Sequence, residues 1–317
     1  MALDPDLEGF LELAEMGRLS GRTRALHELE VAQARADFEA ASAILDPAPP
    51  AALQVRSLSL PSRDGQALQL RLYRQAQDTP QHQAAILYLH GGGNVVGSLD
   101  SHDSVCRRLA ASGRHAVLAL GYRLAPEHPF PTAVNDTLDA ADWLAEHAGA
   151  LGIDSRQVSV AGDSAGATLA TVLAMSAQQG ACRLMPQAQL LFYPVTDISV
   201  ERGSHERYAE GYLLERDTLR WFNRHYCADA AQRTDWRASP LLAAHDQPQL
   251  RTYISLAEYD PLFDEGQAYA ERLKASGTEV TLCVEQGLTH DFLRMGGISS
   301  SRVEGIYADV ERWLQRS

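Results

Sequence analysis

Cysteine is scarce in this sequence of 317 residues, and the four that occur are far apart, at positions 106, 182, 227 and 283. No two of them form a CxxC pair, which argues against a zinc site and a disulfide framework and favours free thiols in a reducing compartment. Long apolar runs are also lacking, since no segment approaches the roughly 18 residues that a membrane-spanning helix needs. The first residues, MALDPDLEGFLELAEMG, have neither a basic region nor an apolar core. We therefore expect no signal peptide and a cytoplasmic location.

Positive charge is the second shortage. Lysine and arginine number 28 against 41 aspartates and glutamates, which gives a net charge of −13. Such a surface repels phosphate backbones and anionic lipids, so we expect no nucleic-acid partner and no stable membrane association. The remaining composition, 45% hydrophobic and 22% charged, is that of an ordinary globular chain. At this length the chain forms either two domains or one large α/β domain with additions.

The leading segment reads as helical and has no strand signal. Its first part shows an apolar face, formed by Phe10, Leu11, Leu13 and Ala14. The helical pattern continues from Thr23 to Ile44, and a proline-rich stretch at 46–50 then ends it.

From residue 53 onward, strand-like runs appear and soon alternate with helical ones. The expected strands cover residues 53–60, 68–72, 84–89, 115–120, 157–161, 187–192, 252–257 and 279–284. The expected helices between and after them cover residues 102–112, 132–148, 165–178, 265–275 and 301–315. Ser62 to Gly65 is a candidate hairpin turn between the first two strands. Repeated β-α-β units require a mostly parallel sheet with helices on both faces, so we predict a mixed eight-stranded α/β sheet.

Two segments do not fit this alternation. Residues 1–50 precede the sheet, and residues 199–236 interrupt it with polar, helical sequence. We expect these two segments to form a cap over the carboxyl edge of the sheet, where open α/β sheets bind ligands. The sheet domain itself then consists of residues 51–198 and 237–317.

The strongest local pattern is Gly162-Asp-Ser164-Ala-Gly166, which fits G-x-S-x-G between a strand and a helix. In that setting the serine lies on a tight, strained turn, where side chains two residues away on either side would collide with neighbouring backbone. The start of the following helix directs its amide groups toward the serine. This context favours Ser164 as a nucleophile.

A second pattern, His90-Gly91-Gly92-Gly93, directly follows the strand at 84–89. Three glycines expose backbone amides of the kind that stabilise the oxyanion formed when an acyl bond is attacked. A phosphate-binding loop is the alternative, but no GK[ST] or GxGxxG follows. We expect His90 to anchor this loop together with Gly91 rather than to transfer protons.

A serine nucleophile needs a base, and the base needs an acid that orients it. The acid is expected at the end of a late strand, where Asp260 is our choice over Glu258 and Asp264; Asp264 is expected to cap the next helix. His290 is the only histidine after Asp260 and follows the last strand, so it is the predicted base. We interpret His102, His115, His205, His225 and His245 as structural or surface residues.

The segment Tyr122 to Pro131 contains three prolines and an Arg123–Glu127 pair. This composition predicts a rigid loop that holds neighbouring loops in place.

Together these segments resemble the hormone-sensitive-lipase family of α/β-hydrolases, the bacterial group IV esterases. The similarity is carried by HGGG at 90–93, YRLAPEHPFPTAVND at 122–136, GDSAG at 162–166, SPLLA at 239–243, DPLFDEG at 260–266 and GLTHDF at 287–292. The resemblance implies an α/β-hydrolase fold with a helical cap, serine carboxylesterase activity on small-molecule esters, and no cofactor or metal. It implies Ser164, Asp260 and His290 as the catalytic triad. It also implies that the amides of Gly92, Gly93 and Ala165 form the oxyanion hole.

Two positions depart from the family pattern: Asn94 replaces a frequent aromatic residue after the glycines, and Ala167 replaces a frequent glycine. Asn94 therefore leaves the shape of the substrate pocket open. Aromatic and apolar residues of the insertion line the pocket or pack the cap on the sheet; they are Tyr208, Tyr212, Leu213, Trp221 and Phe222. Because no long apolar lid is evident, we expect short- to medium-chain esters as substrates.

Other functions compatible with the pattern are an amidase, a lactonase, an arylacetamide-deacetylase-like hydrolase, or a small-molecule receptor that has lost catalysis. All three triad residue types are present, which disfavours the receptor. The sequence leaves the oligomeric state open, with a homodimer as one option.

Overall fold

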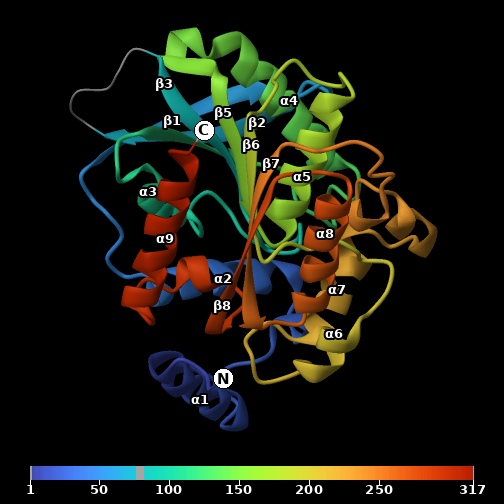
Figure 1. The fold of residues 1–317 in the computed structure, drawn as a ribbon. Coiled ribbons are helices and arrows are strands. Elements are labelled where there is room, and N and C mark those ends of the chain that lie inside the picture. The colour runs from blue at the N-terminus through green and yellow to red at the C-terminus, as the bar shows by residue number, and fades with distance from the viewer. Residues whose placement is uncertain (1, 76–81, 317) are drawn as a thin grey trace.

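The computed structural model of the chain describes residues 2–75 and 82–316. Its centre is an eight-stranded sheet in the order β1-β2-β4-β3-β5-β6-β7-β8 (Figure 1). The strands are β1 (Leu53–Pro61), β2 (Ala67–Gln75), β3 (Gln83–Leu89), β4 (His115–Gly121), β5 (Ile153–Asp163), β6 (Ala188–Phe192), β7 (Arg251–Tyr259) and β8 (Val280–Thr289). β2 pairs antiparallel with both β1 and β4, and the remaining pairs are parallel. The predicted mixed eight-stranded sheet is confirmed.

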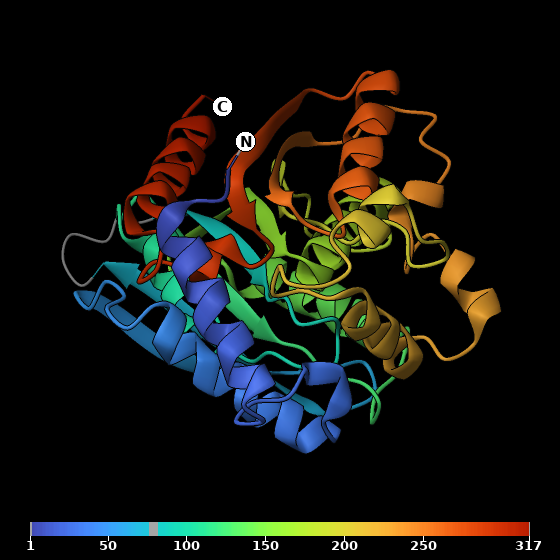
Figure 2. The same cartoon turned by 90° about the horizontal axis from the view of Figure 1, so that it is seen from below.

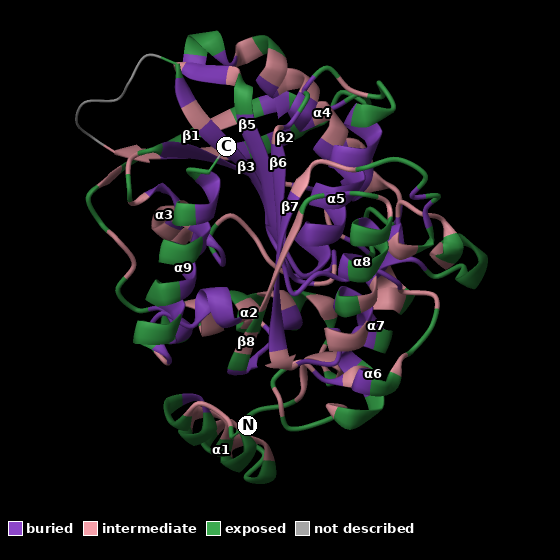
Figure 3. Cartoon of the chain, viewed as in Figure 1, coloured by how far each residue is buried: buried purple, intermediate pink, exposed green. Residues whose placement is uncertain are grey.

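Helices cover both faces of the sheet, as repeated β-α-β connections require. One face carries α3 (Asp103–Ala110) and α9 (Ser300–Leu314), and the other carries α4 (Thr132–His147), α5 (Ala165–Gln178) and α8 (Phe263–Ala275) (Figure 1). Short turns η2 (Gly149–Leu151), η4 (Pro240–Leu242) and η5 (Phe292–Arg294) lie between these elements. Because both faces are covered, the central strands are buried along nearly their whole length (Figure 3).

The N-terminal segment and the insertion lie together at the carboxyl end of the parallel strands (Figures 1 and 2). They contribute α1 (Pro5–Leu19), η1 (Leu26–Glu28), α2 (Val31–Leu45), α6 (Gly203–Arg207), α7 (Arg216–Tyr226) and η3 (Ala230–Thr234). None of the helices in the described part of the chain is both long and apolar enough to cross a membrane.

Two expectations about the N-terminal segment are wrong. The helical pattern is broken between Leu19 and Val31, because Gly21 has a φ of +69° and ends α1 in a left-handed turn. The predicted apolar face of α1 also includes Leu13, yet that side chain is 67% exposed. Phe10 and Leu11 are partly buried and pack against the core.

The last strand ends five residues later than predicted, at Thr289. Gly287 reads in sequence as the start of a loop, but it lies inside β8 with a φ of +78°. The register between β7 and β8 shifts there, so that Tyr259 pairs with Thr289. Beyond this irregularity the strand continues to Thr289, the residue before His290.

The loop from Tyr122 to Pro131 is fixed by ion pairs, but its own Arg123 and Glu127 do not pair with each other as predicted. Arg123 donates to the buried carboxylate of Asp136 in α4, at 2.6 Å, and to Asp64 in the β1–β2 turn. Glu127 instead accepts from Arg35 of α2. The loop is thereby fixed to α4, to the hairpin and to the N-terminal segment.

We predict that Asp136→Ala destabilises the fold by roughly 3–5 kcal/mol, because it leaves the Arg123 guanidinium without its buried partner. Asp64→Ala removes the exposed partner of the same arginine and is the matched control; it is expected to change the free energy of unfolding far less. Urea unfolding curves of both variants measure the difference. Equal losses in the two variants would show that the Arg123–Asp136 pair is not the main contact.

Candidate active site

Ser164 lies at the sharp turn between β5 and α5, with a φ of +53° and a ψ of −122°. The turn is possible because the residues two positions away on either side, Gly162 and Gly166, have no side chains. A Cβ on Gly162 would lie 2.3 Å from the carbonyl oxygen of Gly166, and one on Gly166 would lie 2.0 Å from the oxygen of Leu89. The strained backbone places the serine hydroxyl at the floor of a cavity at the start of α5.

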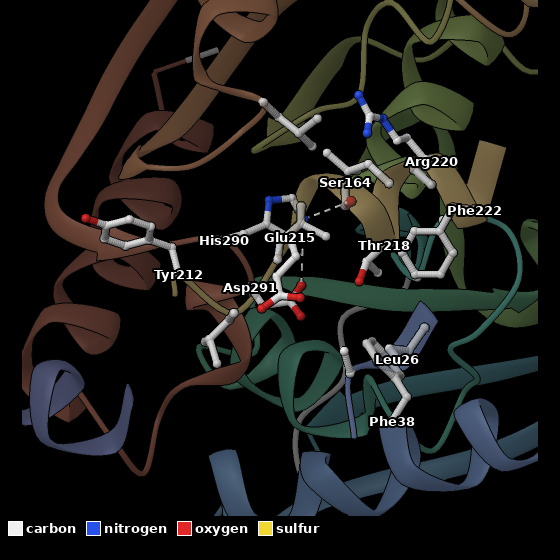
Figure 4. A pocket seen from close by; sticks show the side chains of 18 of the residues that line it. Leu26, Phe38, Ser164, Tyr212, Glu215, Thr218, Arg220, Phe222, His290 and Asp291 are labelled. Atoms are coloured by element: carbon white, nitrogen blue, oxygen red, sulfur yellow. Dashed lines mark hydrogen bonds and ion pairs between the residues drawn. The ribbon is translucent and has the colours of Figure 1, made fainter. Parts of the chain in front are cut away.

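The structure brings together the three residues predicted as a triad. The Ser164 hydroxyl lies 2.9 Å from Nε2 of His290, and the His290 Nδ1 lies 2.8 Å from Oδ2 of Asp260 (Figure 4 shows the first contact). Asp260 follows β7, and its other oxygen accepts the amide of Leu262 at 2.9 Å. Each residue thus lies directly after a strand at the carboxyl edge of the sheet. Since Asp260 accepts from Nδ1, Nε2 is left free to accept the serine proton.

Two opposing effects set the pKa of His290. Burial disfavours the charged imidazolium, but the charge of Asp260 and the hydrogen bond to it, together with the charges of Asp291 and Asp163, outweigh burial. The pKa of His290 is therefore raised above its ordinary value of 6.5. A base with a raised pKa accepts a proton from a serine hydroxyl more readily than a free imidazole does.

The glycine loop approaches the serine through backbone alone. Gly92 and Gly93 have φ values of +111° and +60°, and a Cβ on Gly93 would lie 2.2 Å from the ring of Phe222. The amides of Gly92, Gly93 and Ala165 have no intramolecular acceptor in the described residues, and all three residues line the cavity with Ser164. They are therefore available to bind an anionic oxygen.

Asp163 connects the serine turn to the glycine loop. Its fully buried carboxylate accepts from the Tyr88 hydroxyl at 2.5 Å and from the Gly91 amide at 2.9 Å, and it lies 3.3 Å from His102. Burial alone would raise the pKa of Asp163, but His102 and the hydrogen bonds lower it to about 2. Sequence reasoning missed this residue, although it lies inside the motif next to Ser164.

His90 holds the same loop from its other side. Its Nδ1 lies 2.8 Å from the carbonyl oxygen of Gly91, and its ring stacks on Tyr122 with centroids 4.2 Å apart. Burial lowers the pKa of His90 to about 3, so this ring is neutral at ordinary pH. A neutral, stacked ring with no contact to Ser164 suits an anchoring role.

The cavity above the serine has a volume of about 1250 Å³. Its walls come from the sheet edge, from α1 and α2, and from the insertion. Among the predicted pocket residues, Asn94, Tyr212 and Leu213 line it, and Phe222 does as well. Tyr208 does not; its ring contacts those of Tyr212 and Tyr259 with centroids 5.3 Å and 5.7 Å away. Trp221 is buried outside the lining, where it packs against Phe222 and His225.

Two acidic residues follow Asp260 closely in the sequence, and for one of them, Asp264, the predicted role is wrong. Asp264 does not cap α8, whose first turn begins one residue before it; its carboxylate accepts the Ser204 amide at 2.8 Å and caps α6 instead. Glu265 is buried in the cavity wall and accepts the amides of Thr196 and Asp197. Burial raises the pKa of Glu265 to about 8, against the lowering effect of these two amides. The sequence gives no sign of this environment, because Thr196 is distant along the chain.

No group of three or more His, Cys, Asp and Glu side chains in the described ranges is arranged to hold a metal ion.

Comparison with known proteins supports the interpretation of this geometry. A family model described as α/β hydrolase fold matches residues 86–294. The chain is similar to an ethyl acetate hydrolase of Pseudomonas putida, with 47% identity that covers 99% of each chain. It is also similar to the carboxylic ester hydrolase LipN of Mycobacterium tuberculosis, with 35% identity over 99% of this chain and 84% of that one. Among solved structures, an ester hydrolase from the metagenome of Lake Arreo superposes with a TM-score of 0.93 and 32% identity over 98% of both chains.

We predict that an NMR titration of the imidazole protons shows a pKa above 6.5 for His290 in the unmodified protein. Asp260→Asn removes the charge that favours the imidazolium, so the pKa of His290 should fall below that of the unmodified protein. His90 is the internal control, because a ring with a pKa near 3 does not titrate between pH 5 and 9. An unchanged His290 pKa in the variant would contradict the assigned contact.

Proposed function

Since this chain belongs to the hormone-sensitive-lipase-like family of the α/β-hydrolase superfamily and is a serine carboxylesterase, we propose that Ser164, His290 and Asp260 are its catalytic triad. The observation that carries this proposal is the hydrogen-bonded chain from the Ser164 hydroxyl through His290 to Asp260, with contacts of 2.9 Å and 2.8 Å. Ser164 and His290 line the large cavity, where an ester can reach them, and Asp260 is buried on the Nδ1 side of His290.

In the proposed mechanism, His290 takes the proton of Ser164 as the serine oxygen attacks the ester carbonyl. Asp260 holds the imidazole in the required tautomer and stabilises the imidazolium that forms. His290 then donates this proton from Nε2 to the leaving alcohol, and the acyl group remains on Ser164 as an acyl-serine. Water, activated by the same histidine, attacks the acyl group and releases the acid, and Ser164 regains its proton.

We propose that the amides of Gly92, Gly93 and Ala165 bind the oxyanion of each tetrahedral intermediate. These amides have no acceptor among the residues that the structure describes, and they lie beside Ser164 in the cavity lining, which supports this role. Each such donor contributes about 3–4 kcal/mol to transition-state stabilisation in well-studied enzymes. His90 and Gly91 support the loop from behind, through the contacts to Tyr122 and Asp163.

Residues 1–50 and 199–236 are proposed to form a two-part cap on the sheet domain of residues 51–198 and 237–317. The two parts contact each other: Arg18 of α1 pairs with Glu215 at the start of α7, and His27 lies 3.1 Å from the Thr218 hydroxyl. Both parts line the cavity, so the cap determines which esters fit. Asn94, Tyr212 and Leu213 belong to the proposed substrate pocket.

Two further proposals concern the setting of the enzyme. Four free cysteines in the described residues suit the reducing conditions of the cytoplasm, where we place the protein. We also propose a homodimer, for which β1 and β8, the two edge strands of the sheet, are candidate contact elements for a second copy.

We predict that Ser164→Ala lowers kcat for p-nitrophenyl acetate by at least about 10⁴-fold, because no acyl-enzyme can form. The variant should also lose labelling by a fluorophosphonate probe, which reacts only with an activated serine. Ser159→Ala is the matched control, since Ser159 is a buried serine on the same strand and lies outside the cavity lining. Retained turnover or labelling in Ser164→Ala would refute the assignment.

We predict that p-nitrophenyl esters from acetate to hexanoate are hydrolysed with a higher kcat/KM than the laurate. Apolar side chains such as Phe222 and Val195 line the cavity together with the serine, but charged side chains of α1 also line it, including Glu12, Glu15 and Arg18. A long acyl chain would have to displace water from these groups at a cost in free energy. The constant p-nitrophenol leaving group is the control, and a maximum at laurate would contradict the prediction.

A further inference from the structure

Asp291 places a second carboxylate beside the proposed catalytic histidine. It directly follows His290, and its backbone has a φ of +67°, which turns its side chain into the cavity (Figure 4). One carboxylate oxygen, Oδ1, lies 3.9 Å from His290 Nε2, which is too long for a hydrogen bond. No donor in the described part of the chain lies within hydrogen-bond distance of Oδ1, and the side chain is about 25% exposed.

A buried arginine fixes this carboxylate in position. Arg294 is 1% exposed and donates through Nη1 to Oδ2 of Asp291 at 3.0 Å. Its Nη2 donates to the carbonyl oxygen of Phe38 and to the Ser42 hydroxyl of α2, at 3.2 Å and 2.6 Å. The guanidinium also lies over the Phe38 ring, 4.0 Å from its centroid. With Oδ2 occupied by Arg294, Oδ1 is the oxygen that remains available to a ligand.

The location of Oδ1 identifies the part of the substrate that it meets. In the proposed mechanism His290 Nε2 protonates the leaving alcohol, so the ester oxygen must lie within about 3.2 Å of that nitrogen. The first carbons of the alcohol therefore occupy the region in which Oδ1 lies. A hydroxyl on the second carbon lies within about 3.5 Å of the ester oxygen, and its hydrogen bond spans about 2.8 Å more, so it can reach Oδ1.

A purely apolar alcohol in this region would cover a carboxylate oxygen without offering it a donor, which is unfavourable. A cationic alcohol gains little there, because the Arg294 guanidinium already balances the charge of Asp291 at 3.0 Å. The oxygen therefore favours a neutral hydrogen-bond donor over a second positive charge.

Building on the proposed triad, we propose that Asp291 is a specificity-determining residue that favours esters whose alcohol carries a hydroxyl on its second carbon. Monoesters of 1,2-diols and of glycerol have this chemistry. The hydroxyl donates to Oδ1 of Asp291 while the ester oxygen faces His290.

The test compares 2-hydroxyethyl acetate with propyl acetate, which replaces the hydroxyl by a methyl group. The measured quantity is the ratio of their kcat/KM values in one enzyme, because effects of a substitution on His290 itself cancel in that ratio. Asp291→Gly removes the carboxylate and suits the positive φ, and the ratio should fall about tenfold. Asp291→Asn keeps a neutral acceptor and should give a smaller fall; it also serves if the glycine variant does not fold.

Glu39→Gln is the matched control, since Glu39 is an exposed carboxylate on α2 that does not line the cavity, and its ratio should equal that of the unmodified enzyme. A ratio unchanged within about twofold in both Asp291 variants would overturn the proposal. So would an equal fall in Glu39→Gln. Failure of the triad is recognised separately, because Ser164→Ala would then still hydrolyse both acetates.

Discussion

The carboxylate of Asp163 has no access to solvent, and the position of nearly every other part of the site depends on it. It accepts hydrogen bonds from the Tyr88 hydroxyl and the Gly91 amide and lies beside His102. These contacts connect the carboxyl ends of β3 and β5. An ion in such surroundings is stable only when its oxygens are matched by donors and by positive charge. Because Asp163 immediately precedes Ser164, the same contacts that satisfy the ion also fix the distance between the serine and the glycine loop.

Two segments that are far apart in the sequence form the cavity walls above the sheet edge. The N-terminal helices are close in space to the insertion of residues 199–236, and the Arg18–Glu215 pair, both of whose residues line the cavity, joins the two segments. The sheet edge contributes the proposed catalytic groups, whereas these helices contribute shape and charge. Substitutions in these helices can therefore change which substrate fits, while the strand ends that precede Ser164, Asp260 and His290 stay the same.

The order of motifs along the chain predicted most of the fold, and the structure brings the three residues predicted as a triad into contact. The strands of the sheet are short apolar runs with clear limits, and Ser164, Asp260 and His290 follow three of them, so their meeting at one edge could be foreseen. Features that depend on contacts between distant residues could not be foreseen. Glycine has a low strand propensity, so the sequence predicts that the strand ends before Gly287. Pairing between Tyr259 and Thr289 instead extends β8 beyond this glycine. Arg123 could pair with Glu127 by spacing, but the buried Asp136 is the stronger partner. The partners of Glu265 and Asp163 likewise come from segments that no local pattern connects to them.

The backbone of Ser164 has a further consequence for how this protein can evolve. A serine with a φ of +53° is held in a sparsely populated conformation, at a cost of order 1–3 kcal/mol that the surrounding contacts must offset. A glycine at this position would adopt the same turn without that cost. Activity and thermodynamic stability thus make opposite demands on a single residue. Selection for a more robust fold alone would favour loss of the proposed nucleophile, and a descendant freed from catalysis could gain stability by that one substitution.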